Sequence, residues 1–204
     1  EHGSLKLTNS KTANVQAKFS SVDITRCTNL VLNVQHAEQV SIGTCTDLNL
    51  VCEFSGVTLD QAQNATVSLQ HSKLNAKAVR NLNGSLRHSA IDIKELTETL
   101  SIPLAEHSAI AASIVSAKDF KSATANAQFG AISLRIPKEL EATYLLEHEF
   151  GVIAIDKGIK TLNHTSTEEM SFQSCTGSIG KADASSRIKH TGAHSAITLM
   201  QKKI

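Results

Sequence analysis

The feature of this sequence that most constrains its fold is a short unit that recurs at a nearly fixed interval. The unit consists of Phe or His, then Ser or Gly, one variable residue, and two apolar residues separated by one position. Its copies read FSSVDI from Phe19, FSGVTL from Phe54, HSKLNA from His71, HSAIDI from His88, HSAIAA from His107, FGAISL from Phe129, FGVIAI from Phe150 and HSAITL from His194; HAEQVSI from His36 has one extra residue, and TGSIGK from Thr176 lacks the ring. Such a series indicates a core built from stacked, equivalent segments.

The first apolar residue of each unit marks the phase of the repeat. These markers are Leu5, Val22, Val40, Val57, Leu74, Ile91, Ile110, Ile132, Ile153, Ile179 and Ile197. The first five spacings are 17, 18, 17, 17 and 17 residues, and the later ones are 19, 22, 21, 26 and 18. The regular part of the repeat is therefore N-terminal, and the insertions are C-terminal.

A second set of apolar residues follows each marker at fixed offsets and alternates with polar residues, as in Leu30, Leu32 and Val34. Alternation of this kind is typical of half-buried strands, so each unit is expected to hold two short strands. The polar residues between them include Asn29, Asp47, Asn64 and Asn81, each seven residues after its marker. Because Asn and Asp tolerate a left-handed backbone, these positions are interpreted as a ladder of turns.

The constant offsets favour a solenoid over its competitors. A β-sandwich also has short strands at regular spacing, but it does not require the same residue type at the same offset in successive repeats. Leucine-rich repeats, at about 20 to 29 residues, are too long. The sequence therefore predicts an all-β, single-stranded, right-handed parallel β-solenoid (β-helix) of about ten rungs. One domain, 1–204, is expected, with regular 17–18-residue rungs over 5–109 and longer, more irregular rungs over 110–204.

Composition excludes several classes of function. Twenty basic and nineteen acidic residues are scattered along the chain, which gives a net charge of +1 and no electrostatic signature of nucleic-acid binding. With six Phe, one Tyr and no Trp, stacking of sugars or nucleotides is disfavoured. The apolar runs are too short for a transmembrane segment. A first residue that is not Met and the lack of a signal peptide fit a chain trimmed of a targeting segment.

The row of rings contains the one candidate metal site. His71, His88 and His107 occupy equivalent positions in consecutive units and would stand within about 5 Å of one another. They could bind a metal ion, but the same row holds four Phe residues and lies in phase with the inward residues, which favours a packed ring stack at a corner. If these histidines are buried and neutral, the fold should lose stability in acid. No catalytic residue and no cofactor site are predicted.

Other reactive side chains are interpreted as structural. Cys27 and Cys45, five residues after their markers, are expected to be free, buried thiols in adjacent rungs, with a disulfide as the alternative. Asp23 and Asp92 share an outward row but lie four rungs apart, about 19 Å, which is too far for a pair of hydrolytic acids. Asp60, Lys77 and Lys94 form a neighbouring outward row and are interpreted as a charge ladder, and His190 and His194 are given no role.

Two C-terminal stretches carry a resemblance to a known family. LRIPKELEATYLLEHEFGVIAID from Leu134 and TGSIGKADASSRIKHTGAHSAITL from Thr176 show a strand, a proline turn and a Gly-x-Ile closure. The chain in this respect resembles the bacterial auto-transporter adhesin family, whose head domain is labelled GIN, and related adhesin-like β-solenoid domains. The N-terminal units depart from that pattern, with Ser and often His in place of Gly. The resemblance implies a solenoid fold and a cell-envelope setting, and it assigns no functional residues.

The expected function is therefore a non-enzymatic cell-envelope or secreted adhesin or scaffold domain. Its partner would be a surface protein or glycan rather than a nucleic acid, and copies of the chain could associate through their end rungs. The alternative is a polysaccharide-binding or polysaccharide-active β-helix protein. The expected location is the bacterial cell envelope or the extracellular space.

Overall fold

The structure is a computed structural model that describes residues 3–166 and 171–202. These residues form an all-β solenoid of stacked parallel coils without a helix, and 78% of them lie in strands. The strands are β1 (Gly3–Lys18), β2 (Ser20–Gln35), β3 (Val40–Glu53), β4 (Gly56–Gln70), β5 (Lys73–Arg87), β6 (Ala90–Glu106), β7 (Ala109–Ile114), β8 (Ser122–Gln128), β9 (Ala131–Ile136), β10 (Ala142–Glu149), β11 (Val152–Ile155), β12 (Lys160–Ser166), β13 (Phe172–Ile179), β14 (Arg187–Ala193) and β15 (Ala196–Gln201).

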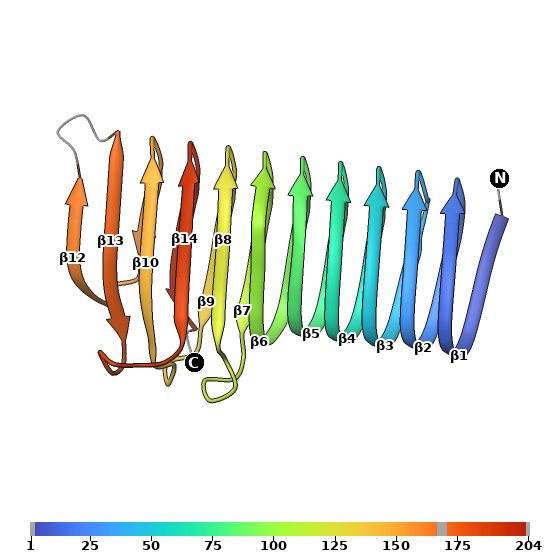
Figure 1. Cartoon of the computed structure of the whole chain (residues 1–204), viewed down its shortest axis with the longest axis horizontal. Helices are drawn as coiled ribbons and strands as arrows, with labels where there is room; N and C mark the ends of the chain where they lie inside the picture. The colour runs from blue at the N-terminus through green and yellow to red at the C-terminus, as the bar shows by residue number, and fades with distance from the viewer. Residues whose placement is uncertain (1–2, 167–170, 203–204) are drawn as a thin grey trace.

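Each of the strands β1 to β6 is one complete coil that runs down one face and up the other (Figure 1). In β2 the inward residues of both faces are buried, while the residues between them are exposed. The inward set of this coil is Val22, Ile24, Cys27, Leu30, Leu32 and Val34. The alternation read from the sequence therefore corresponds to one narrow apolar interior that runs along the solenoid.

The predicted column of markers is confirmed for ten of its eleven members. Pairing between strands places them in the order Leu5, Val22, Val40, Val57, Leu74, Ile91, Ile110, Ile132, Ile197 and Ile153. Eight of the ten are buried, and full burial of a Val, Leu or Ile side chain contributes about 1.5–3 kcal/mol. Ile179 was wrongly assigned as a marker, because it belongs to β13, which runs antiparallel to β10.

The C-terminal rung does not follow the order of the sequence. Parallel pairing places β14 between β8 and β10, and β15 between β9 and β11. The last rung of the chain is thus inserted between two earlier ones (Figure 1). Winding in chain order stops at this point, and the solenoid has about seven turns where about ten rungs were expected.

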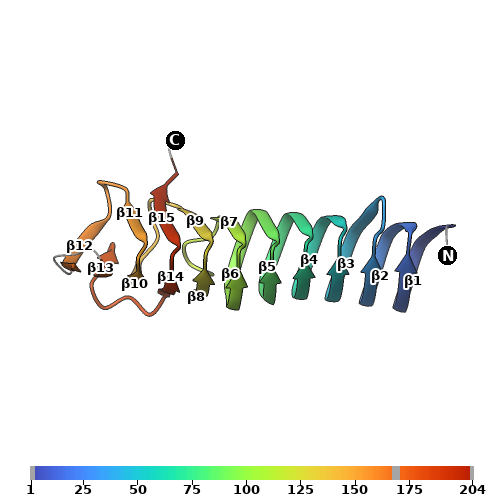
Figure 2. The ribbon, with the colours of Figure 1, turned by 90° about the horizontal axis from the view of Figure 1, so that it is seen from above.

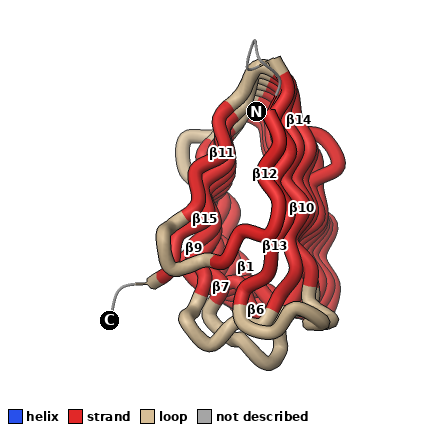
Figure 3. The backbone as a smooth tube through the Cα atoms, turned by 90° about the vertical axis from the view of Figure 1, so that its left-hand side faces the viewer, coloured by secondary structure: helices blue, strands red, loops and turns tan. Residues whose placement is uncertain are grey.

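The two faces of the solenoid end differently at the C-terminal side. One face continues past β10 with the antiparallel strands β13 and β12, whereas the other face ends at β11 (Figure 2). Viewed along the axis, β11 and β12 lie on opposite sides of the interior (Figure 3). This end of the molecule is called the stepped end below.

Candidate binding surface: the aromatic ridge

One corner of the solenoid carries a continuous row of stacked aromatic and imidazole rings, called the aromatic ridge here. The ridge contains, in spatial order, Phe19, His36, Phe54, His71, His88, His107, Phe129, His194 and Phe150. Neighbouring ring centroids are 4.8–5.2 Å apart, and their planes differ by 1–11°. This spacing repeats the distance between adjacent strands, so the coils themselves set the stack.

The ridge exists because the backbone turns the corner in a left-handed conformation. All nine ridge residues have a positive φ of 47–53°. This conformation costs a residue other than glycine about 1–2 kcal/mol. A stacked ring pair contributes about 0.5–1.5 kcal/mol, which offsets a comparable amount. The backbone ladder also continues through the corner, since the amide of His88 donates to the carbonyl of Glu106 at 2.9 Å.

The rings form the expected corner stack, but they do not point into the core. Phe54 is 47% exposed and Phe129 is 52% exposed, and the ridge histidines are exposed as well. Side chains along a strand point alternately inward and outward, and the left-handed residue reverses this alternation at the corner. Counting along the sequence therefore places the ring among the inward residues, whereas in the structure it points outward. The predicted acid sensitivity of buried ridge histidines therefore does not apply to them.

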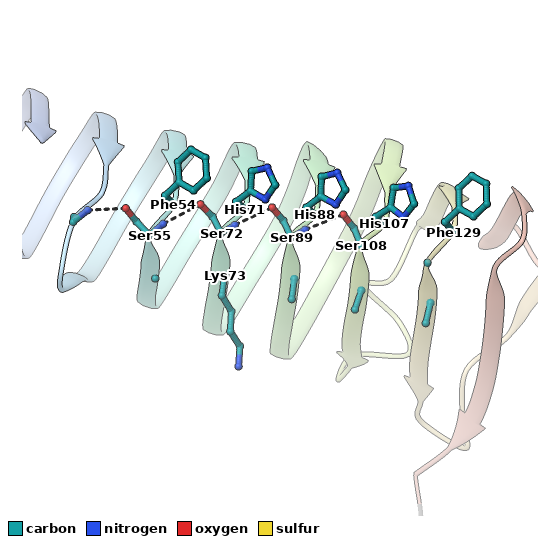
Figure 4. A pocket seen from close by; sticks show the side chains of 16 residues that line it. Phe54, Ser55, His71, Ser72, Lys73, His88, Ser89, His107, Ser108 and Phe129 are labelled. Carbon is teal, nitrogen blue, oxygen red and sulfur yellow. Dashed lines mark hydrogen bonds between the residues drawn. The ribbon is translucent and has the colours of Figure 1, made fainter. Parts of the chain in front are cut away.

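A second ladder, made of serine hydroxyls, lies directly beneath the ridge. Its members are the residues that follow the ring, namely Ser55, Ser72, Ser89 and Ser108, and all four are buried. Each hydroxyl donates to the carbonyl two residues before it at 2.6–2.9 Å. The hydroxyls of the last three also accept the amide of the preceding serine at 3.1–3.2 Å (Figure 4). These bonds satisfy amides that the left-handed turn aims inward, which explains why Ser follows the ring.

A shallow groove runs beside the ridge. Its floor is formed by the serine ladder, and one wall is formed by the rings from Phe54 to Phe129 (Figure 4). The opposite side consists of the next residue of each rung, which is small in four rungs and Lys73 in the fifth. The four small residues are Gly56, Ala90, Ala109 and Ala131. An extended ligand could therefore lie along several coils at once.

The proposed metal row is arranged unfavourably for binding one ion. His71, His88 and His107 are neighbours in the ridge, with ring centroids 4.8 and 4.9 Å apart and planes 1° and 7° from parallel. The nitrogen lone pairs of an imidazole lie in the ring plane, so stacked rings direct them side by side rather than toward a common point. Across residues 3–166 and 171–202, no group of three or more His, Cys, Asp or Glu side chains could hold a metal ion.

The Asn and Asp ladder is present, but the structural reason given for it was wrong. Among the described residues other than glycine, a positive φ occurs only in the ridge, so these polar residues do not make left-handed turns. Their side chains instead bond from coil to coil. The amide of Asn64 donates to Asp47 at 2.8 Å, the amide of Asn81 donates to Asn64 at 3.1 Å, and the hydroxyl of Thr99 donates to Asn81 at 2.8 Å.

The acidic side chains considered for hydrolysis are either far apart or held in ion pairs. The registers place Asp23 and Asp92 in one outward row, four coils apart as expected. Asp92 is paired with Lys94 of its own strand. Glu98 is largely buried and lies between Arg80 at 2.6 Å and Lys121 at 3.2 Å. Hydrogen bonds from these two cations lower the pKa of Glu98, which keeps it ionised and unsuited to donating a proton near neutral pH.

The row that contains Asp60, Lys77 and Lys94 follows the predicted register over consecutive coils.

All four cysteines are free and buried, and Cys27 is aligned with Cys45 in the next coil. Burial raises the pKa of Cys45 to about 11, with smaller contributions from Cys27 and Asp47. A protonated, enclosed thiol of this kind is unreactive and serves as a small core side chain.

Two buried histidines lie side by side in the interior of the C-terminal coils, where no role was predicted from the sequence. His148 and His190 are each 1% exposed, and their ring centroids are 4.6 Å apart. Nδ1 of His148 shares a 2.9 Å hydrogen bond with the Ser195 hydroxyl. Nε2 of His148 and both ring nitrogens of His190 have no hydrogen-bond partner. Gly151 and Gly192 make room for the rings, since a Cβ at either position would clash with this cluster.

Burial lowers the pKa of both histidines of this cluster. The pKa of His190 falls to about 3, with a further contribution from neighbouring His148 and an opposing one from the Ala125 carbonyl. Burial alone accounts for the lowered pKa of His148. Both imidazoles are consequently neutral at physiological pH, and they lie too deep to meet a substrate.

The fold and this surface define the chain as a β-solenoid protein with an exposed aromatic ridge along one corner. Comparison with protein-family models, curated proteins and solved structures finds no match. Over the described ranges, no helix has the length and apolar character needed to cross a bilayer.

Proposed function

We propose that this chain is a non-enzymatic binding protein of the bacterial cell envelope or exterior, which acts as an adhesin or scaffold domain. The observation that carries the proposal is the aromatic ridge. It exposes a long row of rings on a rigid solenoid, and exposed aromatic groups of this extent mark interaction surfaces more often than solvated ones.

The ridge suits an extended partner that lies along the groove. Each ring covers the faces of its neighbours, so partners meet mainly ring edges, which carry partial positive charge. Ring edges attract carbonyl, hydroxyl and carboxylate oxygens, and the small residues of the groove let a chain approach closely. Such contacts repeat in each coil, so several weak contacts add up over the length of the solenoid.

A polysaccharide is the second candidate partner, as a bound ligand or as a substrate. The length of the groove favours a polymeric ligand, whether a protein strand or a glycan. The covered ring faces disfavour sugar stacking along the ridge, and this preference places a protein partner first.

The test is binding to a panel of purified cell-surface proteins, extracellular-matrix proteins and polysaccharides, measured by biolayer interferometry. A double variant, Phe54→Asn and Phe129→Asn, removes two exposed rings while Asn tolerates the left-handed backbone. Its matched control, Val31→Ser and Val51→Ser, removes exposed apolar side chains away from the ridge.

The proposal expects at least one panel member to bind the native chain, with the ridge variant weakened by about tenfold and the control unchanged. Equal binding by all three proteins, or release of reducing sugars from a panel polysaccharide, would contradict it. Fractionation of the source cells tests the location, and recovery of the protein only in the cytoplasm would count against the envelope setting.

A further inference from the structure

The stepped end leaves one side of the solenoid shorter than the other. On the first face the strand order ends β10, β13, β12, and on the second face it ends β15, β11. Two more strands at a spacing of about 4.8 Å make the first face about 10 Å taller. Figure 2 shows that β13 and β12 extend further along the axis of the molecule than β11 does.

Strand β11 has a free edge at this step. The amides of Val152 and Asp156 donate to the carbonyls of Ser195 and Leu199, on the side of β15, at 3.0 and 2.9 Å. Because successive backbone groups alternate in direction, those of Ile153 and Ile155 face the other way. Within residues 3–166 and 171–202, no strand pairs with that side of β11 or with the outer side of β12. A free edge of this kind is a template for another strand.

Apolar side chains gather around the step. Phe150 and Val152 are each 60% exposed, and Leu162 is 52% exposed. Ile153 is only partly buried, although Ile132, its counterpart two coils earlier in the column, is 2% exposed. The core on this side is thus left uncovered at the last coil, and covering it would remove apolar surface from water.

We propose that two copies of this chain associate tail to tail through their stepped ends about a two-fold axis, with β12 of each copy beside β11 of the other. Such an axis places the tall face of one copy against the short face of its partner, so that each copy fills the step of the other. One patch meets an identical patch, which gives a closed dimer rather than a filament.

The strand directions allow this pairing. Two successive antiparallel steps give β12 the direction of β10. The chain reverses at Phe150, so β11 runs opposite to β10 and therefore opposite to β12. An axis parallel to the strands preserves their directions, and the new contacts are antiparallel pairs, which hydrogen-bond well.

The same arrangement matches opposite charges. Antiparallel pairing brings the end of β11 next to the start of the partner's β12, and therefore brings Asp156 beside the partner's Lys160. Both side chains are exposed in the single chain. The two-fold axis makes this contact twice. A strand from an unrelated protein would pair with the edge of β11 and leave the outer edge of β12 unpaired, so a second copy accounts for more of the surface.

The test is the molar mass of the full chain, measured by light scattering after size exclusion over a wide range of protein concentrations. The proposal expects twice the 21.8 kDa mass of one chain. Lys160→Glu should raise the dimer dissociation constant by about tenfold or more, because like charges then meet twice. The double swap Asp156→Lys with Lys160→Glu should restore it to within about threefold.

Lys189→Glu is the matched control, since Lys189 is exposed on β14 away from the step, and it should leave the dimer unchanged. Circular dichroism of each variant establishes that the fold is intact. A native chain that is monomeric at every concentration, one that grows into larger polymers, or a dimer that Lys160→Glu leaves as tight as before would overturn the proposal.

Discussion

Acid should destabilise this protein through the buried pair His148 and His190. In the unfolded chain a histidine has a pKa of about 6.5. In the folded chain the pKa of His190 is about 3, mainly because of burial. Below pH 6.5 the unfolded chain therefore binds a proton that the folded chain does not. The stability contributed by neutral His190 is complete above that pH and is lost as the pH falls toward 3.

The size of the loss at pH 5 follows from the gap between that pH and the unfolded pKa, because the folded pKa lies lower still. At pH 5 the medium is about 1.5 pH units below the unfolded pKa, and each unit corresponds to about 1.4 kcal/mol. His190 alone should then lower the free energy of unfolding by about 2 kcal/mol between pH 8 and pH 5. The lowered pKa of His148 acts in the same direction, so about 2 kcal/mol is the minimum expected.

Urea unfolding followed by circular dichroism at pH 8 and pH 5 measures this difference. His190→Leu replaces the imidazole with a side chain suited to a column between Ala125 and Leu146, and it should remove the contribution of His190. The control His88→Asn changes an exposed ridge histidine and should keep the native acid sensitivity. Equal stability of the native chain at both pH values, or an unchanged loss in His190→Leu, would refute the reasoning.

Three further predictions concern the interior and the ridge. Leu74→Ala, in the middle of the marker column, should cost about 2–5 kcal/mol in urea unfolding, and a cost below about 1 kcal/mol would argue against a packed column. Ser89→Ala leaves the buried amide of Ser72 without its partner and should cost about 1–3 kcal/mol in the same measurement, whereas a neutral change would speak against the ladder. The Cys45 thiol should react with a maleimide only after unfolding, as mass spectrometry would show, and rapid labelling of the native protein would be inconsistent with its burial.

Much of the fold could be predicted because a solenoid requires the same residue type at equivalent positions. The spacing of Val22, Val40, Val57 and Leu74 reports this directly, and the structure stacks them in one column. The order of the coils could not be predicted in the same way. Each coil presents a similar apolar set, so the edge that the last rung joins depends on the loops and not on the repeat.

The direction of the ridge rings was predicted wrongly because counting along a strand assumes an unbroken alternation. The left-handed corner shifts the phase by one position, which turns Phe54 and His88 outward although their offsets suggest the interior. A signal was present in the recurring Ser after the ring, since a serine that is needed to satisfy an inward amide implies a tight corner. The His148 and His190 cluster joins strands that are distant in sequence, and no spacing rule could reveal it.

The fold requires a continuous ridge in which the last rung of the chain separates two earlier ones. Nuclear Overhauser effects between assigned ring protons test this order most directly. The structure predicts contacts from His194 to both Phe129 and Phe150, at centroid distances of 4.9 and 5.1 Å, and no contact between the two phenylalanine rings. A direct contact between Phe129 and Phe150 would show that the chain winds in sequence order, and would contradict the inserted position of the last rung.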